Sequence, residues 1–405
     1  MAKPDLKPAT RIRAIRLLDA VKDVIGAVAT KDTIPVLSHV MIAVAGGAID
    51  LTATDLDMQA MRRCATDDRN GPDSGDWVKS IAPFALTVPG KALLAILGGF
   101  DGDAMVTLTV EGSRLAISAG RARFRLATLA AADLPVLTLR DMAHEFEIYA
   151  AVLSDAIDSV EHAISTEETR YYLNGIYVHP DRLNLHLATT DGHRLARLRI
   201  DAPDGAASWP PMIVPRGLVG ELGKALAHSI KVAANSIVVV RTNAAGNLVS
   251  FTMPAADDGE IELISKTIDG TFPDYNRVIP HAAKRELTVG REALAGAVAR
   301  VSALAHKATR LIRLDITEDR IDLTVVNADL GDAREEVPAL CEGDDQAIGF
   351  DGKYLRDALG KIATDDVVIR WTDGEAPVRI EASGADKDQP DGLPRLVHVL
   401  MPVRV

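Results

Sequence analysis

One strand-and-turn pattern occurs three times in this 405-residue chain. In each copy, alternating apolar residues lead to an acid or amide, and these residues (Asp55, Asp191 and Asn327) follow one another at intervals of 136 residues. Alternation with a period of two that ends in such a residue is typical of a half-buried strand running into a turn. The pattern therefore predicts three related units. The three stretches are AIDLTATDLDM (48–58), LNLHLATTDGH (183–193) and RIDLTVVNADL (320–330).

Each unit also carries two helical patterns in the same order. The first has apolar residues at i,i+4 spacing, which places them on one helix face: Leu17/Val21, Leu153/Ile157 and Leu294/Val298. The second follows a short apolar strand and a Pro or Asp, in LTVPGKALLAIL (86–97), MIVPRGLVGELGKAL (212–226) and IGFDGKYLRDALGKI (348–362). Three elements repeated in one order predict three homologous α+β domains, over residues 1–138, 139–282 and 283–405.

The net charge of −12 argues against a protein that grips nucleic acid through one broad basic face. The positive charge is nevertheless concentrated on the predicted helices, with one acidic exception at 153–169. Helices that shared one surface would form a basic lining inside an acidic shell, and such a lining could contact phosphates without reading sequence. The helical cations are Arg11, Arg13, Arg16, Lys22, Lys91, Arg216, Lys224, Lys231, Arg291, Arg300, Lys307, Arg310, Lys353, Arg356 and Lys361.

Several other classes of protein are disfavoured. No apolar run has the length of a membrane helix, and the first residues lack the apolar region of a secretory signal. Cys64 and Cys341 form no metal-ligand spacing, which favours a cytoplasmic protein without a bound metal or other cofactor. An enzyme that uses Asp191 and His193 as an acid–base pair is a rival reading. Known nucleophile, zinc and phosphate-loop motifs are absent, so a turn-capping role for Asp191 is the better account.

Seven stretches together closely resemble the β sliding clamp of bacterial DNA polymerase III along nearly the full chain. RYYLNG, TDGHRL and FPDYNRVIP are the most specific of these motifs. The resemblance implies three DNA-clamp domains of two helices and antiparallel sheets each, and a head-to-tail ring of two subunits around duplex DNA. It also implies a processivity factor without catalytic activity. The remaining matching stretches are IPVLSHVMIAVAGGAIDLTATDLDM, VEGSRLAISAGRARFRLATLAAADLP, MIVPR and the terminal MPVRV.

The resemblance also implies specific functional residues. A hydrophobic pocket would receive short linear motifs from DNA polymerase and clamp-loader subunits. Its residues would be Leu173, Thr190, Gly192, His193, Arg194, Leu195, Pro273, Val278, Met401, Pro402, Val403 and Arg404. Contacts to double-stranded DNA, independent of its sequence, would come from Lys31, Tyr171, Tyr172 and Arg216. The homodimer interface would join Phe124 and Leu126 to Ala303 and Leu304.

Some features depart from the pattern of the family. The loops at 66–77 and 383–395 look enlarged, Glu167 and Glu168 add negative charge just before RYYLNG, and the chain ends in Val405. These departures keep open an alternative, a divergent clamp paralogue (a decoy or an inhibitor-resistance form) with altered partner binding.

Overall fold

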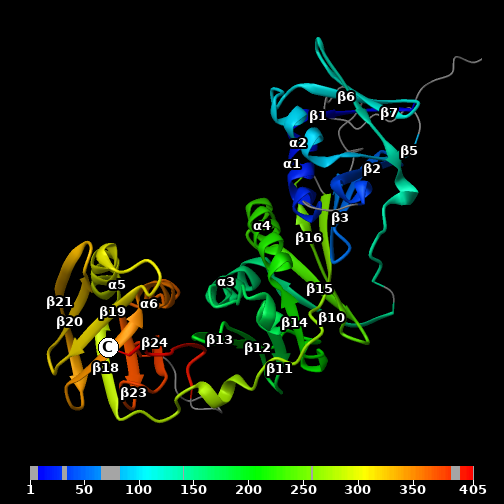
Figure 1. The fold of residues 1–405 in the computed structure, drawn as a ribbon. Helices are drawn as coiled ribbons and strands as arrows, with labels where there is room; N and C mark the ends of the chain where they lie inside the picture. The colour runs from blue at the N-terminus through cyan, green and yellow to red at the C-terminus, as the bar shows by residue number, and fades with distance from the viewer. Residues whose placement is uncertain are drawn as a thin grey trace, which may run out of the picture. The chain divides into compact units, whose positions relative to one another are not determined.

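The computed structural model describes residues 8–29, 34–64, 83–139, 141–256, 259–384 and 393–404. Along these residues one order of elements repeats three times: strand, helix, four strands, helix, three strands (Figure 1). The first copy holds β1 (Ala9–Arg13), α1 (Ala14–Val24), β2 (His39–Ala45), β3 (Ala48–Thr54), β4 (Met58–Cys64), β5 (Phe84–Pro89), α2 (Gly90–Gly98), β6 (Met105–Glu111), β7 (Arg114–Ala119) and β8 (Ala122–Ala127).

The second and third copies repeat this order and confirm the predicted repeat. The second holds β10 (Met142–Tyr149), α3 (Ala150–Glu161), β11 (Gly175–Pro180), β12 (Asn184–Thr190), β13 (Arg194–Asp201), β14 (Met212–Pro215), α4 (Arg216–Val232), β15 (Ile237–Asn243), β16 (Leu248–Ala255) and β17 (Gly259–Lys266). The third holds β18 (Arg285–Gly290), α5 (Arg291–Val301), β19 (Leu311–Ile316), β20 (Arg320–Asn327), β21 (Gly331–Glu342), β22 (Gln346–Asp351), α6 (Gly352–Leu359), β23 (Asp366–Trp371), β24 (Val378–Ala382) and β25 (Leu396–Leu400).

The second helix of each copy begins where the sequence predicts, and the first helix buries the predicted face. Pro89 and Pro215 stand directly before α2 and α4, where the fixed φ of proline suits a helix start. Before α6 the Asp351 side chain accepts two backbone N–H groups of the first turn, at 2.8 and 3.2 Å. The i,i+4 pairs of the first helix in each copy are all buried, and Leu294 and Val298 are completely inaccessible.

Strands of neighbouring copies join into continuous antiparallel sheets. The nine-stranded sheet has the order β10-β15-β16-β17-β4-β3-β2-β5-β9, where β9 is Leu129–Ala130, and β4 and β17 make its join between copies. The twelve-stranded sheet has the order β14-β11-β12-β13-β25-β24-β23-β18-β21-β20-β19-β22, with its join at β13 and β25. A four-stranded sheet, β1-β6-β7-β8, completes the set.

Contacts divide the chain into two compact units. One comprises residues 1–154, 203–209 and 214–267, and the other 155–202, 210–213 and 268–405. The division falls inside the second copy, whose strand β17 pairs with β4 of the first copy and whose strand β13 pairs with β25 of the third. In the second unit, α5 and α6 lie side by side on the strands of the third copy and cover Trp371 and Phe350, both almost fully buried (Figure 1).

The predicted helical cations need correction at the helix ends. Arg11 and Arg13 belong to β1, because that strand pairs with β6 along its whole length before α1 begins. Lys307 and Arg310 lie beyond α5 and the 3-10 turn η7 (Ser302–Leu304), and Lys361 follows α6. Amphipathic spacing in the sequence continued past the residues at which the hydrogen bonds of these helices end.

Candidate protein-binding pocket

The acid or amide that ends the repeated strand caps a turn in all three copies. The Oδ1 atom of Asp55 accepts the backbone N–H groups two and three residues further on, at 3.0 and 2.8 Å. The corresponding distances are 2.9 and 3.0 Å for Asp191 and 3.0 and 3.3 Å for Asn327. The turn-capping interpretation of Asp191 is therefore confirmed. One of its two hydrogen bonds comes from the backbone N–H of His193, and His193 is exposed.

Gly192 meets two requirements inside the second of these turns. Its φ is +90°, and Leu56 at the equivalent position of the first copy has φ +82°, so both of these turns use a left-handed backbone here. At Gly192, however, a Cβ atom would lie 2.4 Å from Nη1 of Arg170. Glu167 holds this arginine in place through an Nε–Oε2 hydrogen bond of 2.9 Å. A glycine here lets the Arg170 guanidinium lie directly against the turn.

Arg194 connects the same turn to helix α6. Its guanidinium reaches Asp191 at 3.0 Å and Asp357 at 2.7 Å, and it lies 4.2 Å above the ring of Tyr354. Burial raises the pKa of Asp357, but hydrogen bonds from Lys353 and Arg194 outweigh burial and hold that pKa below its ordinary value. The Arg194 side chain is only 8% exposed, and Asp191 and Asp357 already balance its charge within the protein. Arg194 therefore forms a fixed wall.

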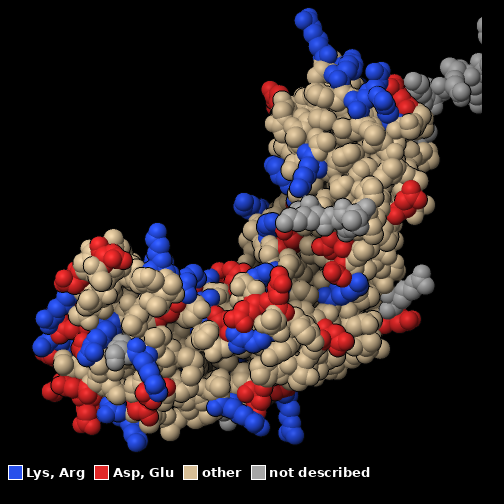
Figure 2. Space-filling view, in the orientation of Figure 1, with Lys and Arg blue, Asp and Glu red and all other residues tan. Residues whose placement is uncertain are grey.

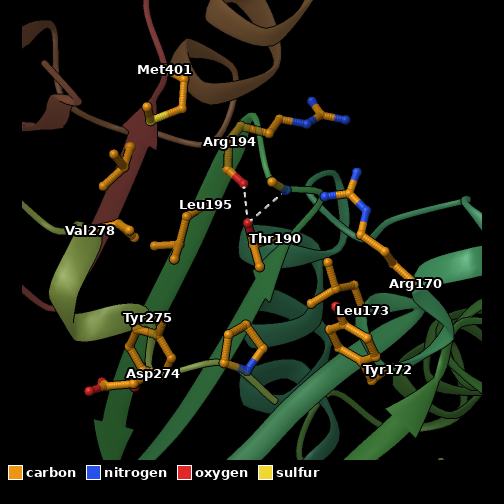
Figure 3. A pocket seen from close by; sticks show the side chains of 13 residues that line it. Arg170, Tyr172, Leu173, Thr190, Arg194, Leu195, Asp274, Tyr275, Val278 and Met401 are labelled. Carbon is orange, nitrogen blue, oxygen red and sulfur yellow. Dashed lines mark hydrogen bonds between the residues drawn. The ribbon is translucent and has the colours of Figure 1, made fainter. Parts of the chain in front are cut away.

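Beside this wall lies a pocket of about 260 Å³. Figure 3 shows its side chains converging from β12, β13, β25 and two 3-10 turns, η4 (Glu168–Leu173) and η6 (Tyr275–Val278). Leu173, Leu195 and Val399 form a buried apolar floor, whereas Val278 and Met401 are 43% and 38% exposed at the rim. The pocket is lined by Arg170, Tyr172, Leu173, Thr190, Gly192, Arg194, Leu195, Pro273, Asp274, Tyr275, Val278, Val399 and Met401.

Eight of the twelve predicted pocket residues line this cavity, and the other four (His193, Pro402, Val403 and Arg404) do not. His193 is in the turn, and its carbonyl accepts the N–H of Met401 at 2.9 Å. Past Pro402 the chain pairs with the edge strand β22, where the N–H of Val403 donates to the carbonyl of Gly349 at 2.9 Å. Val403 and Arg404 consequently line a second, more polar depression, with the Arg404 guanidinium 3.5 Å from Glu375.

Five lining residues were not predicted for the pocket: Arg170, Tyr172, Asp274, Tyr275 and Val399. Four of them belong to the matched motifs RYYLNG and FPDYNRVIP, and these motifs are the sequence signal by which they could have been predicted. Tyr172 had been assigned to DNA, but its side chain packs against the core under the pocket. Val399 belongs to β25, whose place next to β13 depends on a pairing between distant segments.

The other DNA candidates occupy different surroundings. Lys31 lies outside the described residues, as do the loop residues 66–77, 385–392 of the second loop, and Val405. Tyr171 is 53% exposed on η4, and Arg216 is exposed at the first position of α4. Of the helical cations, Lys22, Lys224 and Lys353 pair with an acid on their own helix, at 3.0, 2.7 and 2.5 Å. Such pairs reduce the positive charge of these helices below what the sequence suggests.

The dimer candidates lie on strand β8 and on the 3-10 turn η7, which follows α5. Phe124 is 39% exposed on β8, the edge strand of the four-stranded sheet, and its ring meets that of Phe100 edge-on at 5.8 Å. Leu126 is half-buried on the same strand. In η7, Ala303 is exposed and Leu304 is packed partly against the core of the third copy.

Among the described residues, no three or more His, Cys, Asp or Glu side chains are grouped so as to hold a metal ion. None of the helices in these ranges combines the length and apolar content needed to span a bilayer.

Comparisons with known proteins identify the family. Models of the DNA polymerase III beta subunit match its N-terminal domain at residues 9–138, its central domain at 147–274 and its C-terminal domain at 276–396. The beta sliding clamp of Caulobacter vibrioides is 36% identical over 97% of this chain and 99% of its own length. That of Pseudomonas aeruginosa is 31% identical over 96% and 98%.

Solved structures give the same result. A sliding clamp from Bartonella birtlesii, solved bound to griselimycin, is 32% identical with a TM-score of 0.88 and covers 99% of this chain and 100% of its own. The Caulobacter crescentus clamp, solved with polyethylene glycol bound to its putative beta-motif tethering region, is 34% identical with a TM-score of 0.87 over 98% and 99%. The chain therefore belongs to the DNA polymerase III beta subunit family, the beta sliding clamps.

Proposed function

We propose that this protein is a DNA sliding clamp that encircles duplex DNA as a homodimeric ring and tethers a DNA polymerase and clamp-loader subunits through the pocket. The observation that carries the proposal is the apolar pocket itself, together with membership of the family. In this reading the protein performs no catalytic step, needs no cofactor, and acts in the cytoplasm, where bacterial DNA lies. Its three clamp domains would span residues 1–138, 139–282 and 283–405.

The pocket is suited to a short peptide with apolar anchors. Its floor is buried and apolar, and its rim exposes Val278 and Met401, which a bound ligand would remove from water. A volume of about 260 Å³ accommodates one or two aliphatic or aromatic side chains rather than a folded domain. Because Arg194 is already paired, specificity must come from the shape of the pocket and from the groups at its edge.

Titration with a peptide derived from a polymerase clamp motif tests the pocket. We expect Met401→Ala to weaken binding by about tenfold, because it removes an apolar wall whose burial stabilises the complex by about 1.5 kcal/mol. The matched control is Leu183→Ala, which changes an apolar residue that is 74% exposed and does not line the pocket. Equal losses in both variants would contradict the assignment. Deletion of residues 401–405 should abolish peptide binding and leave dimerisation intact. Loss of the dimer in this variant would refute the assignment of these residues to the pocket.

The internal joints between copies support closure into a ring. Within the first unit, β4 pairs antiparallel with β17. β4 is the third strand after the first helix of the first copy, and β17 is the last strand of the second copy. Within the second unit, β13 pairs with β25 in the same way. The equivalent strands that remain are β21 and β8. Among the described residues, β8 is an edge strand. On the side of β21 that faces β18, only Ala339–Glu342 are paired, so the first part of β21 has a free edge there within the described chain.

The charges on these two strands are complementary. β8 exposes Arg123 and Arg125, and Figure 2 shows Lys and Arg gathered at the end of the first unit that carries β6 and β7. The free part of β21 carries Asp332, Glu335 and Glu336 against one arginine, Arg334, and Glu335 also pairs with Arg300. Opposite charges across a joint fix its partners and its register. A third joint between two copies of the chain would thus repeat the internal joints and close a head-to-tail dimer.

Sedimentation of charge-reversal variants tests this joint. Arg123→Glu combined with Arg125→Glu should weaken the dimer by about tenfold or more, because like charges then face each other across the strands. Arg182→Glu, which reverses an exposed arginine on the β11–β12 turn, is the control and should leave the dimer unchanged. A dimer insensitive to the double reversal would refute the β8–β21 joint.

A topological assay tests encirclement of DNA. A ring loaded on circular DNA should stay bound until the DNA is linearised and should then slide off the ends. Contacts through Arg216 and other helix residues would be with phosphates, so direct binding should weaken steeply with salt and show no sequence preference. Retention on linear DNA with free ends would contradict the ring.

A further inference from the structure

A row of four side chains leads from the pocket wall to the protein surface. The hydroxyl of Tyr275, a lining residue, lies 2.8 Å from Nε2 of His179 on β11. The His179 ring stacks on that of His186 on β12, with centroids 4.9 Å apart and planes only 3° from parallel. The two histidines are directly opposite each other in the β11–β12 ladder, which explains the stack. Nε2 of His186 lies 2.6 Å from Oδ2 of Asp181.

His179 and Tyr275 can form their hydrogen bond without a buried charge. Burial, and then the neighbouring His186, lower the pKa of His179 to about 4, so its ring is neutral at physiological pH. A neutral imidazole has one nitrogen that donates and one that accepts, and a tyrosine hydroxyl can do either. Nε2 of His179 and the hydroxyl of Tyr275 are therefore complementary in both tautomers of the histidine.

Turn η6 is fixed to the protein mainly by buried side chains. The backbone hydrogen bonds at its two ends, from the N–H of Arg277 to the carbonyl of Asp274 and from the N–H of Ile279 to that of Asn276, are long at 3.4 Å. No side chain caps its start. Tyr275 is only 5% exposed and packs with Phe272 and Ile279 in the apolar cluster under the pocket. The same turn presents Val278 at the rim.

We propose that His179 is a positioning residue for the pocket: its hydrogen bond fixes the hydroxyl of Tyr275 and thereby holds the η6 wall in its binding-competent place. His179 does not itself line the cavity and acts through Tyr275. The inference rests on the proposed function, because it assigns a role in motif binding. His186 and Asp181 complete the row by holding the ring against which His179 stacks.

Peptide titration with hydroxyl-deletion and acceptor variants tests the proposal. Tyr275→Phe and His179→Leu should each weaken binding of the polymerase-motif peptide about threefold to tenfold, since one hydrogen bond contributes about 0.5 to 1.5 kcal/mol. The double variant should lose no more than either single one, because both remove the same bond. His179→Gln, which keeps an acceptor oxygen, should restore most of the affinity. Backbone amides of residues 275–278 should exchange hydrogen faster in the weakened variants only.

Tyr177→Phe is the matched control, because Tyr177 belongs to the same aromatic cluster, stacked 4.9 Å from Phe272, but does not line the pocket. It should bind like the unmodified protein. If the unmodified protein fails to bind the peptide, the proposed function fails. If it binds and Tyr275→Phe binds equally well, or His179→Gln is as weak as His179→Leu, the positioning role of His179 is overturned.

Discussion

Substitution of Gly192 by alanine is the sharpest local test of how the pocket is built. The backbone at this position has φ +90°, and a left-handed conformation costs a residue with a Cβ about 1 to 2 kcal/mol. Loss of chain freedom in the unfolded state offsets about 0.4 to 1 kcal/mol of this. The Cβ would also stand 2.4 Å from Nη1 of Arg170, so the guanidinium must move and give up Glu167. That partly exposed pair contributes about 0.2 to 1 kcal/mol.

These contributions predict that Gly192→Ala lowers the free energy of unfolding by about 1 to 2 kcal/mol. They also predict weaker peptide binding, because Arg170 lines the pocket and is displaced. Urea denaturation followed by circular dichroism measures the first quantity, and peptide titration measures the second. The combination of Gly192→Ala with Arg170→Ala separates the two causes, because it removes the clash and keeps the backbone strain.

Leu56 supplies the control, since it occupies the equivalent turn of the first copy with φ +82°. Leu56→Gly should stabilise the protein by about 1 kcal/mol and leave peptide affinity unchanged. If Gly192→Ala is as stable as the parent protein and binds peptide equally well, the reasoning about the turn and about Arg170 is refuted.

Three further predictions concern the same unit. Arg194→Met should destabilise the protein by about 3 kcal/mol, because it leaves the largely buried Asp191 without a cation and leaves Asp357 with Lys353 alone; a loss below 1 kcal/mol in urea denaturation would contradict this. Asp55→Ala and Asp191→Ala each remove a turn cap worth about 1 kcal/mol, but only Asp191→Ala should weaken peptide binding in titration. Burial, and then the charge of Arg194, lower the pKa of His162 to about 4, so the unfolded chain binds more protons between pH 6.5 and 4. Stability should therefore fall on acidification through this window, by about 3 kcal/mol for this residue, and His162→Phe should remove that share of the slope.

The sequence by itself determined the repeat, the elements and the turns. Alternation and i,i+4 spacing are local patterns, and so is a side chain that caps the next two or three N–H groups. These signals placed the strands before Asp55, Asp191 and Asn327, both helices of each copy, and the buried face of the first one. These signals were weaker at helix ends: the sequence pattern places Arg11 on a helix, but in the structure it pairs with β6 as part of strand β1.

Only the tertiary structure decided which distant side chains meet. Gly192 needs to be glycine because Arg170 lies against it, and Arg194 is unavailable to a ligand because Asp357 on α6 pairs with it. Tyr275 is fixed by His179, nearly one hundred residues earlier in the chain. Each of these contacts depends on sheet pairing between segments far apart in sequence, and no local pattern encodes that pairing. The residue types of the pocket could therefore be identified from the sequence, but their positions relative to one another are determined by the fold.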